Sequence, residues 1–357
     1  MNIRSTWRAV FCASIFLVVS ACTEKVPAVP EITAASPASP DAPRQQSVVV
    51  YSSAAAAQIR QTTEAYTADT GIKVELVIDD YSKLAGKFEK PGRVPVADLF
   101  IAGSLADLAS AVESDVFRPT YFDTDSRQAV QNLRDPENVW YALSFRARVV
   151  IYNTSLVTDK ELSTVSDYAS LAGEVWRERL CLSSSKVAGN RSLIALHIRE
   201  LGVRETESIV RGWRANFSGQ FYRDDVDLLR AVAAGDCHIA IADTSALASF
   251  VASDRDAPLA AHRFPDEART LVDISAAGVT RHAKNPLGAT SLLQWLESKH
   301  ANALFAASGL EFPANPAATP ALAMEQFIDF AADPMAVAQL AFLHEDAALL
   351  AERARYP

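Results

Sequence analysis

The order of apolar runs and helix-forming segments near the start of the folded region constrains the fold more than any other feature of this sequence. Three short apolar runs, typical of buried strands, occur at residues 47–51, 73–78 and 97–101. Helix-forming residues fill the two intervals, and Gly71 follows the first of them as a helix-terminating residue. A strand–helix–strand–helix–strand order predicts a parallel, doubly wound α/β sheet. Ligands bind to such sheets beyond the carboxyl ends of the strands.

A second series of the same kind follows. Apolar strands are expected at residues 149–152, 179–182, 238–242 and 271–279. Helices are expected at 192–199, 224–234, 286–298 and 301–308, and over 321–354 with an interruption at Asp333 and Pro334. At about 150 residues per domain, the 357 residues suit two α/β lobes. We expect the first lobe to hold residues 47–145 and about 280–330, and the second to hold 146–279 and 331–357.

The beginning of the chain is typical of an exported lipoprotein. Two arginines precede an apolar stretch at residues 9–19, and small residues lead into Cys22. The sequence Val-Ser-Ala-Cys that ends at Cys22 resembles a bacterial lipobox, in which the cysteine is lipidated; the alternative is a plain signal peptide with a chance cysteine. We therefore expect a signal peptide at 1–21, a proline-, alanine- and serine-rich tether at 22–46, and a periplasmic protein anchored to the cell envelope by lipid.

The charge balance and the missing motifs exclude several classes of function. Acidic residues number 43 against 34 lysines and arginines, which gives a formal net charge of −9. Because nucleic-acid binding needs clustered cations, nucleic acid is not an expected partner. No apolar run reaches the ~18–20 residues of a membrane-spanning helix, so lipid would be the only attachment to a membrane. The common signatures of hydrolases, metalloproteases and nucleotide-binding enzymes are absent, and we expect no enzyme.

Two cysteines remain once the leader is removed and Cys22 is lipidated. Cys181 and Cys237 both lie at edges of predicted strands in an exported chain, where thiols oxidise. We expect a disulfide between them, with two unpaired buried thiols as the alternative. Neither cysteine belongs to a Cys-x-x-Cys motif, which argues against a thiol-redox or zinc site.

Several segments of the chain carry a resemblance to known proteins. The clearest are ALSFRARVVIYN at 142–153, AVAAGDCHIAIA at 231–242 and SAAGVTRHAKN at 275–285; shorter ones lie at 49–53, 70–74, 97–100 and 133–136. In this order, over about residues 47–356, they resemble the ferric ion-binding proteins, the solute-binding components of bacterial iron ABC importers. The resemblance implies a two-lobed, type II-like periplasmic binding protein with a cleft that closes at a two-strand hinge. It also implies a small ligand or metal complex as cargo and delivery to an inner-membrane ABC permease; we expect a monomer.

The iron ligands of that family do not recur in this sequence. Iron(III) prefers anionic oxygen ligands, and family members supply a tyrosine pair, a histidine or glutamate in some members, and a bound carbonate or phosphate. The family's tyrosine positions correspond to residues 243–246, which read Asp-Thr-Ser-Ala here. The histidine position corresponds to the alanines at 54–57, and the glutamate position to Ile-Ala-Gly-Ser at 101–104. Free iron would therefore lack its usual ligands. The best substitute is the oxygen cluster Asp-Asp-Tyr at 79–81, in which the phenolate of Tyr81 is the candidate metal ligand; the alternative role of Tyr81 is a partly buried aromatic ring.

The half of the site that holds the anion is better retained. Family members bind the anion with backbone N–H groups and hydroxyls at a helix N-terminus, which attracts negative charge. The candidate ligand- or anion-binding residues are Ser52, Ser53, Arg146, Arg148, Ser184, Ser185, Asn190, Asp225 and Ser245. Ordinary N-capping is the alternative for the serines, and a salt bridge between the lobes is the alternative for the two arginines, which share one face of a strand. Asp225 would oppose an anion and suits a cationic ligand instead.

The sequence thus predicts a lipid-anchored solute-binding component of an ABC importer of the iron(III) or metal-complex class. The only cofactor it suggests is a metal ion or metal complex with a synergistic anion. The alternative function is a sensing or scaffold lipoprotein that keeps the fold and binds a small organic ion or a partner protein.

Overall fold

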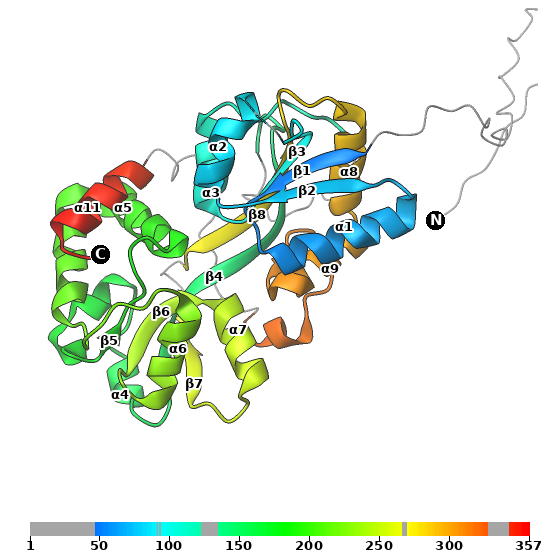
Figure 1. Ribbon diagram of the computed structural model, residues 1–357. Coiled ribbons are helices and arrows are strands. Elements are labelled where there is room, and N and C mark those ends of the chain that lie inside the picture. Colours follow the sequence, from blue (N-terminus) through cyan, green and yellow to red (C-terminus); the bar gives the residue numbers. More distant parts are fainter. Residues whose placement is uncertain (1–46, 91, 93, 123–134, 266–269, 328–342) are drawn as a thin grey trace, which may run out of the picture. The chain divides into compact units, whose positions relative to one another are not determined.

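The computed structural model of the chain describes residues 47–90, 92, 94–122, 135–265, 270–327 and 343–357 (Figure 1). The expected signal peptide, Cys22, the tether and the interruption at Asp333 lie outside these residues. No helix in the described ranges is both long enough and apolar enough to span a bilayer.

Three strands and three helices form the first part of the fold; the sequence predicts the three strands and the two helices between them, but not the third helix. They are β1 (Val48–Ser52), α1 (Ala56–Thr70), β2 (Val74–Ile78), α2 (Tyr81–Glu89), β3 (Leu99–Ala102) and α3 (Leu105–Glu113). Strand β1 pairs in parallel with both β2 and β3. Gly71 ends α1 in the left-handed conformation at φ 73°, which a residue without a Cβ adopts at little cost.

Two long antiparallel strands, β4 (Tyr141–Asn153) and β8 (Val272–Val279), join this sheet to a second group of strands. Over its first half β4 pairs with β8, and from Arg148 onward it pairs with β6 (Ile239–Asp243). The sheet order is β2-β1-β3-β8-β4-β6-β5, and β7 and β9 each pair with β4. The sheet is therefore mixed rather than wholly parallel, because β8 runs antiparallel to both β3 and β4.

The second group of elements surrounds the far half of β4. It contains α4 (Asp159–Leu162), η2 (Ala169–Ala172), η3 (Glu174–Trp176), β5 (Leu180–Cys181), α5 (Ala188–Ala215), α6 (Asp225–Ala234), α7 (Thr244–Ser253) and β7 (Leu259–His262). Helix α5 extends well beyond the expected residues 192–199 and is broken at Gly202, whose φ of 80° is not helical. Helix α6 ends at Gly235 as expected, whereas α7 and β7 have no counterpart among the predicted elements.

The remaining elements are mostly helical. They are α8 (Pro286–Leu296), α9 (Lys299–Gly309), β9 (Phe312–Pro313), η4 (Leu322–Phe327) and α11 (His344–Arg353). Helix α8 begins where Asn285 Oδ1 accepts a hydrogen bond from Gly288 N–H at 3.0 Å, with a proline in the first turn. Met324 and Phe327 of η4 pack in one apolar cluster with Leu228 of α6, so η4 contacts the second group of elements.

Alternate residues of β1 face opposite sides of the sheet. Val48 and Val50 pack with residues of α1 and α8, whereas Val49 and Tyr51 pack with residues of α2 and α3. Figure 1 shows these helices on either side of the first strands. Helices on both faces bury the strands completely, as the continuous apolar run of β1 requires.

A disulfide joins Cys181, at the end of β5, to Cys237, just before β6. The two Cα atoms are 5.8 Å apart, and both residues are fully buried. Because β5 and β6 are neighbouring parallel strands, the bond reinforces one edge of the second group of strands. The expected pairing is confirmed.

Candidate functional site

Four turns that lead from a strand into a helix meet beside the middle of β4. They follow β1, β3, β5 and β6 and open α1, α3, α5 and α7. The turns after β1 and β3 touch, since a Cβ added to Gly103 would lie 2.6 Å from the Cα of Ala54. The other two reach β4: a Cβ on Gly189 would lie 2.9 Å from Arg148 Cδ, and Thr244 Oγ accepts a bond from the β4 backbone at 3.1 Å. Helix N-termini carry partial positive charge, so this region favours acidic side chains.

The side chain of Arg148 is fully buried among these turns. Its Nη1 donates to Asp225 at 2.5 Å and to Asp243 at 3.0 Å. Its Nη2 donates to Asn190 Oδ1 at 2.6 Å. Burial opposes the charge, but the two carboxylates outweigh burial and raise the pKa of Arg148 above its ordinary value. Arg148 is therefore a permanently charged group of the protein interior.

Arg146 lies two residues earlier on the same face of β4, and its side chain is only 12% exposed. Its Nη1 donates to Glu311 at 2.7 Å, and its Nη2 donates to Gly103 O at 3.1 Å and to Asp273. Its Nε donates to Asp243 at 3.3 Å. Burial again opposes the charge, and the three carboxylates raise the pKa of Arg146 well above its ordinary value. Asp243 thus bridges the two arginines of β4.

Four carboxylates balance the two arginines and the helix N-termini. They belong to Asp225, Asp243, Asp273 and Glu311. Burial raises the pKa of Asp273 although Arg146 opposes this, whereas for Asp243 the effect of burial is outweighed by both arginines, which lower the pKa. These carboxylates surround the two guanidinium groups, and the nearby helix N-termini add partial positive charge that also attracts them.

A family model described as bacterial extracellular solute-binding protein matches residues 61–336 of the chain. The chain belongs to the bacterial extracellular solute-binding protein family. Among similar proteins, iron uptake protein A1 of Synechocystis is 31% identical over 288 residues, which cover 77% of this chain and 79% of that protein. The major ferric iron-binding protein of Neisseria meningitidis serogroup B is 26% identical over 294 residues, which cover 80% and 84%.

Solved structures of similar fold agree with this assignment. The Trichodesmium FutA (IdiA) protein in complex with iron and citrate ligands matches with a TM-score of 0.79 and 29% identity, over 87% of this chain and 100% of that one. Ferric iron-binding protein A of Mannheimia haemolytica in an open conformation matches with a TM-score of 0.77 and 22% identity, over 87% and 99%. The expected two-lobed α/β fold is confirmed. Because the family consists of solute-binding proteins, the expectation of no enzyme is confirmed as well.

In this solute-binding protein, Ser52 and Ser53 support two loops and do not open a helix. Helix α1 begins only at Ala56 and has no side-chain cap. Ser52 Oγ donates to Ile101 O at 3.0 Å, and Ser53 Oγ accepts a bond from Gly103 N–H at 3.1 Å. The expectation that these serines lie at a helix N-terminus is therefore wrong, because α1 starts beyond them.

The predicted anion-binding residues at the start of α5 already have partners within the solute-binding protein. Ser184 Oγ and Ser185 N–H donate to the same oxygen, Pro357 O, at 2.8 and 2.7 Å. Asn190 uses its Oδ1 to accept from Arg148. An anion at this helix N-terminus would have to displace these contacts.

The two arginines match the alternative interpretation, in which they form salt bridges. Arg146 contacts Gly103 O on one side of β4 and Asp243 on the other. Asp225 receives a cation, as its charge suggests, but that cation is Arg148 of the same chain. Ser245 lies in the first turn of α7 and is half-buried.

Tyr81 lies at the start of α2 among aromatic side chains. Its ring centroid is 6.4 Å from that of Phe88 and 5.7 Å from that of Phe100. Burial raises the pKa of the phenol, so the phenolate that a metal would need is disfavoured. In the part of the chain that the structure describes, no group of three or more histidine, cysteine, aspartate or glutamate side chains is placed to hold a metal ion.

Three acidic residues near the two arginines are absent from the predicted set: Asp107, Asp273 and Glu311. Asp273 is the one charged residue in the buried strand β8. A charge within an apolar run is visible in the sequence, and because a buried charge needs a partner, it could have indicated a site residue. Burial raises the pKa of Asp107, in the first turn of α3, and nearby Ser53 and Arg146 offset this only in part. Glu311 carries no local signal, since its partners are distant in the sequence.

Proposed function

We propose that this protein is the solute-binding component of a bacterial ABC importer and that its cargo is a metal complex of the iron(III) class. The family match supports solute binding, and relatives named for iron uptake and ferric iron binding support the cargo class. One similar structure holds both iron and citrate. Cargo would favour closed lobes, and an inner-membrane permease would recognise the closed form.

The proposed hinge consists of β4 and β8. These two strands connect the proposed first lobe, residues 47–145 and about 280–330, to the proposed second lobe, residues 146–279 and 331–357. The contacts of η4 with α7 favour placing residues 322–327 with the second lobe. We propose that the protein acts as a monomer.

The crowding at the turn after β3 favours a cargo in which the metal ion already carries its own chelating ligands. By the resemblance to ferric ion-binding proteins, a glutamate ligand of some members falls in the segment that contains Gly103. No side chain fits there without a shift of the backbone, since a Cβ would lie 2.6 Å from Ala54 Cα. The tyrosine pair falls within residues 243–246, at the start of α7, which contain no tyrosine. A chelated ion needs hydrogen-bonding partners from the protein and not metal ligands.

Ferric citrate added to the purified protein is expected to raise the melting temperature without producing a tyrosinate-to-iron charge-transfer band. A ligand that binds only the folded state stabilises it by about 2.7 kcal/mol at a hundred times its Kd. Visible absorption and a thermal melt measure the two effects, with citrate alone as the control. A strong visible band would contradict the lack of tyrosine ligands. A melting temperature equal to that with citrate alone would contradict an iron(III) complex as cargo.

A second candidate function is a sensing or scaffold lipoprotein. It is favoured because polar groups near β4 that could bind a cargo already form hydrogen bonds within the protein. Donors of Arg146 and Arg148, and those of Ser184 and Ser185, go to protein oxygens. A thermal-shift panel of metals, metal chelates and small anions separates these functions. An importer component of the proposed class responds to metal complexes, a sensing protein responds only to a small ion, and a scaffold that binds a partner protein responds to none of them.

We also propose that Cys22 carries a lipid that holds the protein at the cell envelope, with 1–21 as signal peptide and 22–46 as tether. Cys22→Ala is expected to move the protein from the membrane fraction to the soluble periplasm, because the lipid is the only proposed attachment. Cell fractionation with immunoblotting measures the distribution, and the unaltered protein in the membrane pellet is the control. A variant that stays in the pellet would refute the anchor.

A further inference from the structure

Arg146 lies at the point where β4 exchanges β8 for β6 as its partner. The register pairs Arg146 with Asp273 of β8, and two residues later it pairs Arg148 with Asp243 of β6. The Arg146 side chain is 12% exposed, so its guanidinium group is largely removed from water. A charge in such a position must find its partners within the protein.

The partners of Arg146 come from both proposed lobes. On the side of the first lobe, Nη2 donates to Gly103 O at 3.1 Å and Nη1 donates to Glu311 at 2.7 Å. On the side of the second lobe, Nε donates to Asp243 at 3.3 Å, directly before α7. Because a guanidinium group presents its donors in fixed and different directions, one side chain can contact both lobes at once.

The contacts continue into each lobe. Asp243 also accepts from Arg148 at 3.0 Å, and Arg148 contacts Asp225, in the first turn of α6, at 2.5 Å. In the other direction, Asp273 accepts from Arg146 and, at 2.6 Å, from the backbone N–H that opens α3. An unbroken series of hydrogen bonds therefore runs from the N-terminus of α3 to the N-terminus of α6.

We propose that Arg146 is a latch that holds the two lobes at a fixed angle before any cargo is bound. This inference rests on the proposed two-lobe function and adds a control of the lobe angle to it. Separating the lobes would break the bond from Nε to Asp243 or the bond from Nη2 to Gly103 O, and would remove a charge-assisted hydrogen bond from a largely buried guanidinium group, which is costly. The latch thus sets the population of the binding-competent state, on which the apparent affinity for cargo depends.

Hydrogen–deuterium exchange of the full-length chain without cargo tests the latch. Arg146→Met keeps much of the length of the side chain but removes all its donors. We expect backbone amides in two segments, residues 103–107 and 243–246, to exchange at least about tenfold faster, because a charge-assisted hydrogen bond is lost on each side. The matched control is Arg179→Met, since Arg179 pairs with Glu161 at 2.6 Å within the second lobe and is 21% exposed. This control should leave both segments unchanged.

Arg146→Lys is a second variant, which keeps the positive charge and therefore disturbs folding less than Arg146→Met. A single ammonium nitrogen lacks the spread of the guanidinium donors and cannot reproduce the separate contacts that Nε and Nη2 make, so the latch predicts faster exchange in both segments here too. Unchanged exchange at either segment in Arg146→Lys, or acceleration confined to one segment in Arg146→Met, would overturn the latch. Because no cargo is present, such a result leaves the ferric citrate test of the proposed function unaffected.

Discussion

Replacing Arg148 with methionine is expected to lower the free energy of unfolding by about 3–5 kcal/mol, because removing one member of a buried ion pair leaves the buried carboxylate of Asp225 without its cation. Arg148 is fully buried, and its Nη1 lies 2.5 Å from Asp225 and 3.0 Å from Asp243. Methionine fills a similar space but donates no hydrogen bond to either carboxylate. Equilibrium unfolding in urea, followed by tryptophan fluorescence, measures the loss.

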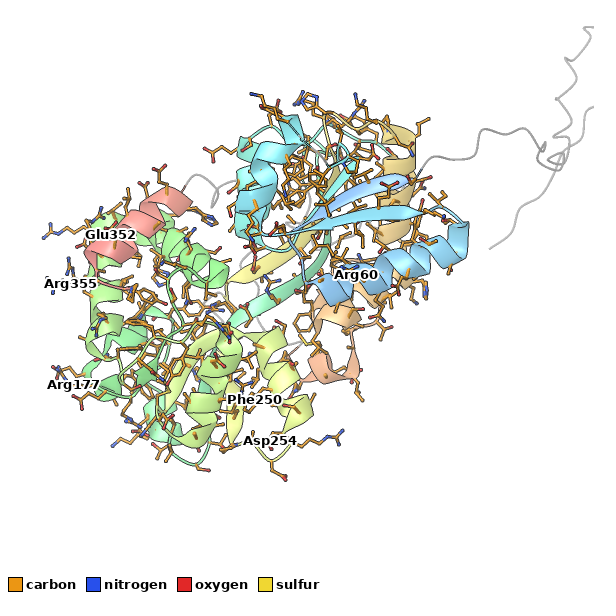
Figure 2. The ribbon with its side chains drawn as sticks, viewed as in Figure 1. Arg60, Arg177, Phe250, Asp254, Glu352 and Arg355 are labelled. Carbon is orange, nitrogen blue, oxygen red and sulfur yellow. A yellow bond between two sulfur atoms is a disulfide. The ribbon has the colours of Figure 1, made fainter. Side chains whose placement is uncertain are left out.

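Arg177→Met is the matched control for this substitution. Arg177 pairs with Glu174 at 3.0 Å, its side chain is 59% exposed, and it lies at the outer edge of the molecule in Figure 2. Exposed ion pairs contribute roughly 0–1 kcal/mol, so little change is expected. Adding Asp225→Asn to Arg148→Met should recover part of the loss, because it removes one unpaired charge. Equal stability of Arg148→Met and Arg177→Met would show that the buried ion pairs stabilise nothing.

Removal of the disulfide is expected to lower the free energy of unfolding by roughly 4 kcal/mol in the chain-entropy model, since the bond constrains the unfolded chain over a sequence separation of 56 residues. The double variant Cys181→Ala with Cys237→Ala removes the bond and leaves no thiol at either position. Both positions are fully buried, so alanine introduces no new exposed group. Urea unfolding of the double variant and the unaltered protein measures the difference.

Two further measurements assign this effect to the disulfide itself. A reductant should destabilise the unaltered protein by a similar amount and leave the double variant unchanged. When the unaltered protein is denatured without reductant, neither Cys181 nor Cys237 should react with a maleimide. Labelling of both thiols would show that the bond does not form in the purified protein.

The strands and helices near the start of the folded region were predictable because their signals are local. Apolar runs alternate with helix formers there, and Gly71 ends α1 at φ 73° as a residue without a Cβ can. The first half of β4 was less predictable, since it carries Arg146, whose burial depends on other strands. Its strand conformation becomes evident only through pairing with β8.

For the candidate site, the sequence located the relevant segments but not their contacts. Alternation correctly placed Arg146 and Arg148 on one face of a strand. The partners Asp273 and Glu311 lie 127 and 165 residues away from Arg146 in the sequence. Ser184 likewise contacts an oxygen 173 residues away. Contacts of this range depend on how the whole chain folds, and no local pattern encodes them.

The close approach of Gly103 to Ala54 limits the evolutionary routes open to this protein. Because a Cβ at position 103 would lie 2.6 Å from the neighbouring backbone, an acidic residue can arise there only if the other turn moves as well. Such a change would therefore need coordinated mutations in both turns. A protein with the mutation at position 103 alone would be less stable. Ser245, half-buried at the opening of α7, already carries a Cβ and is not subject to this restriction.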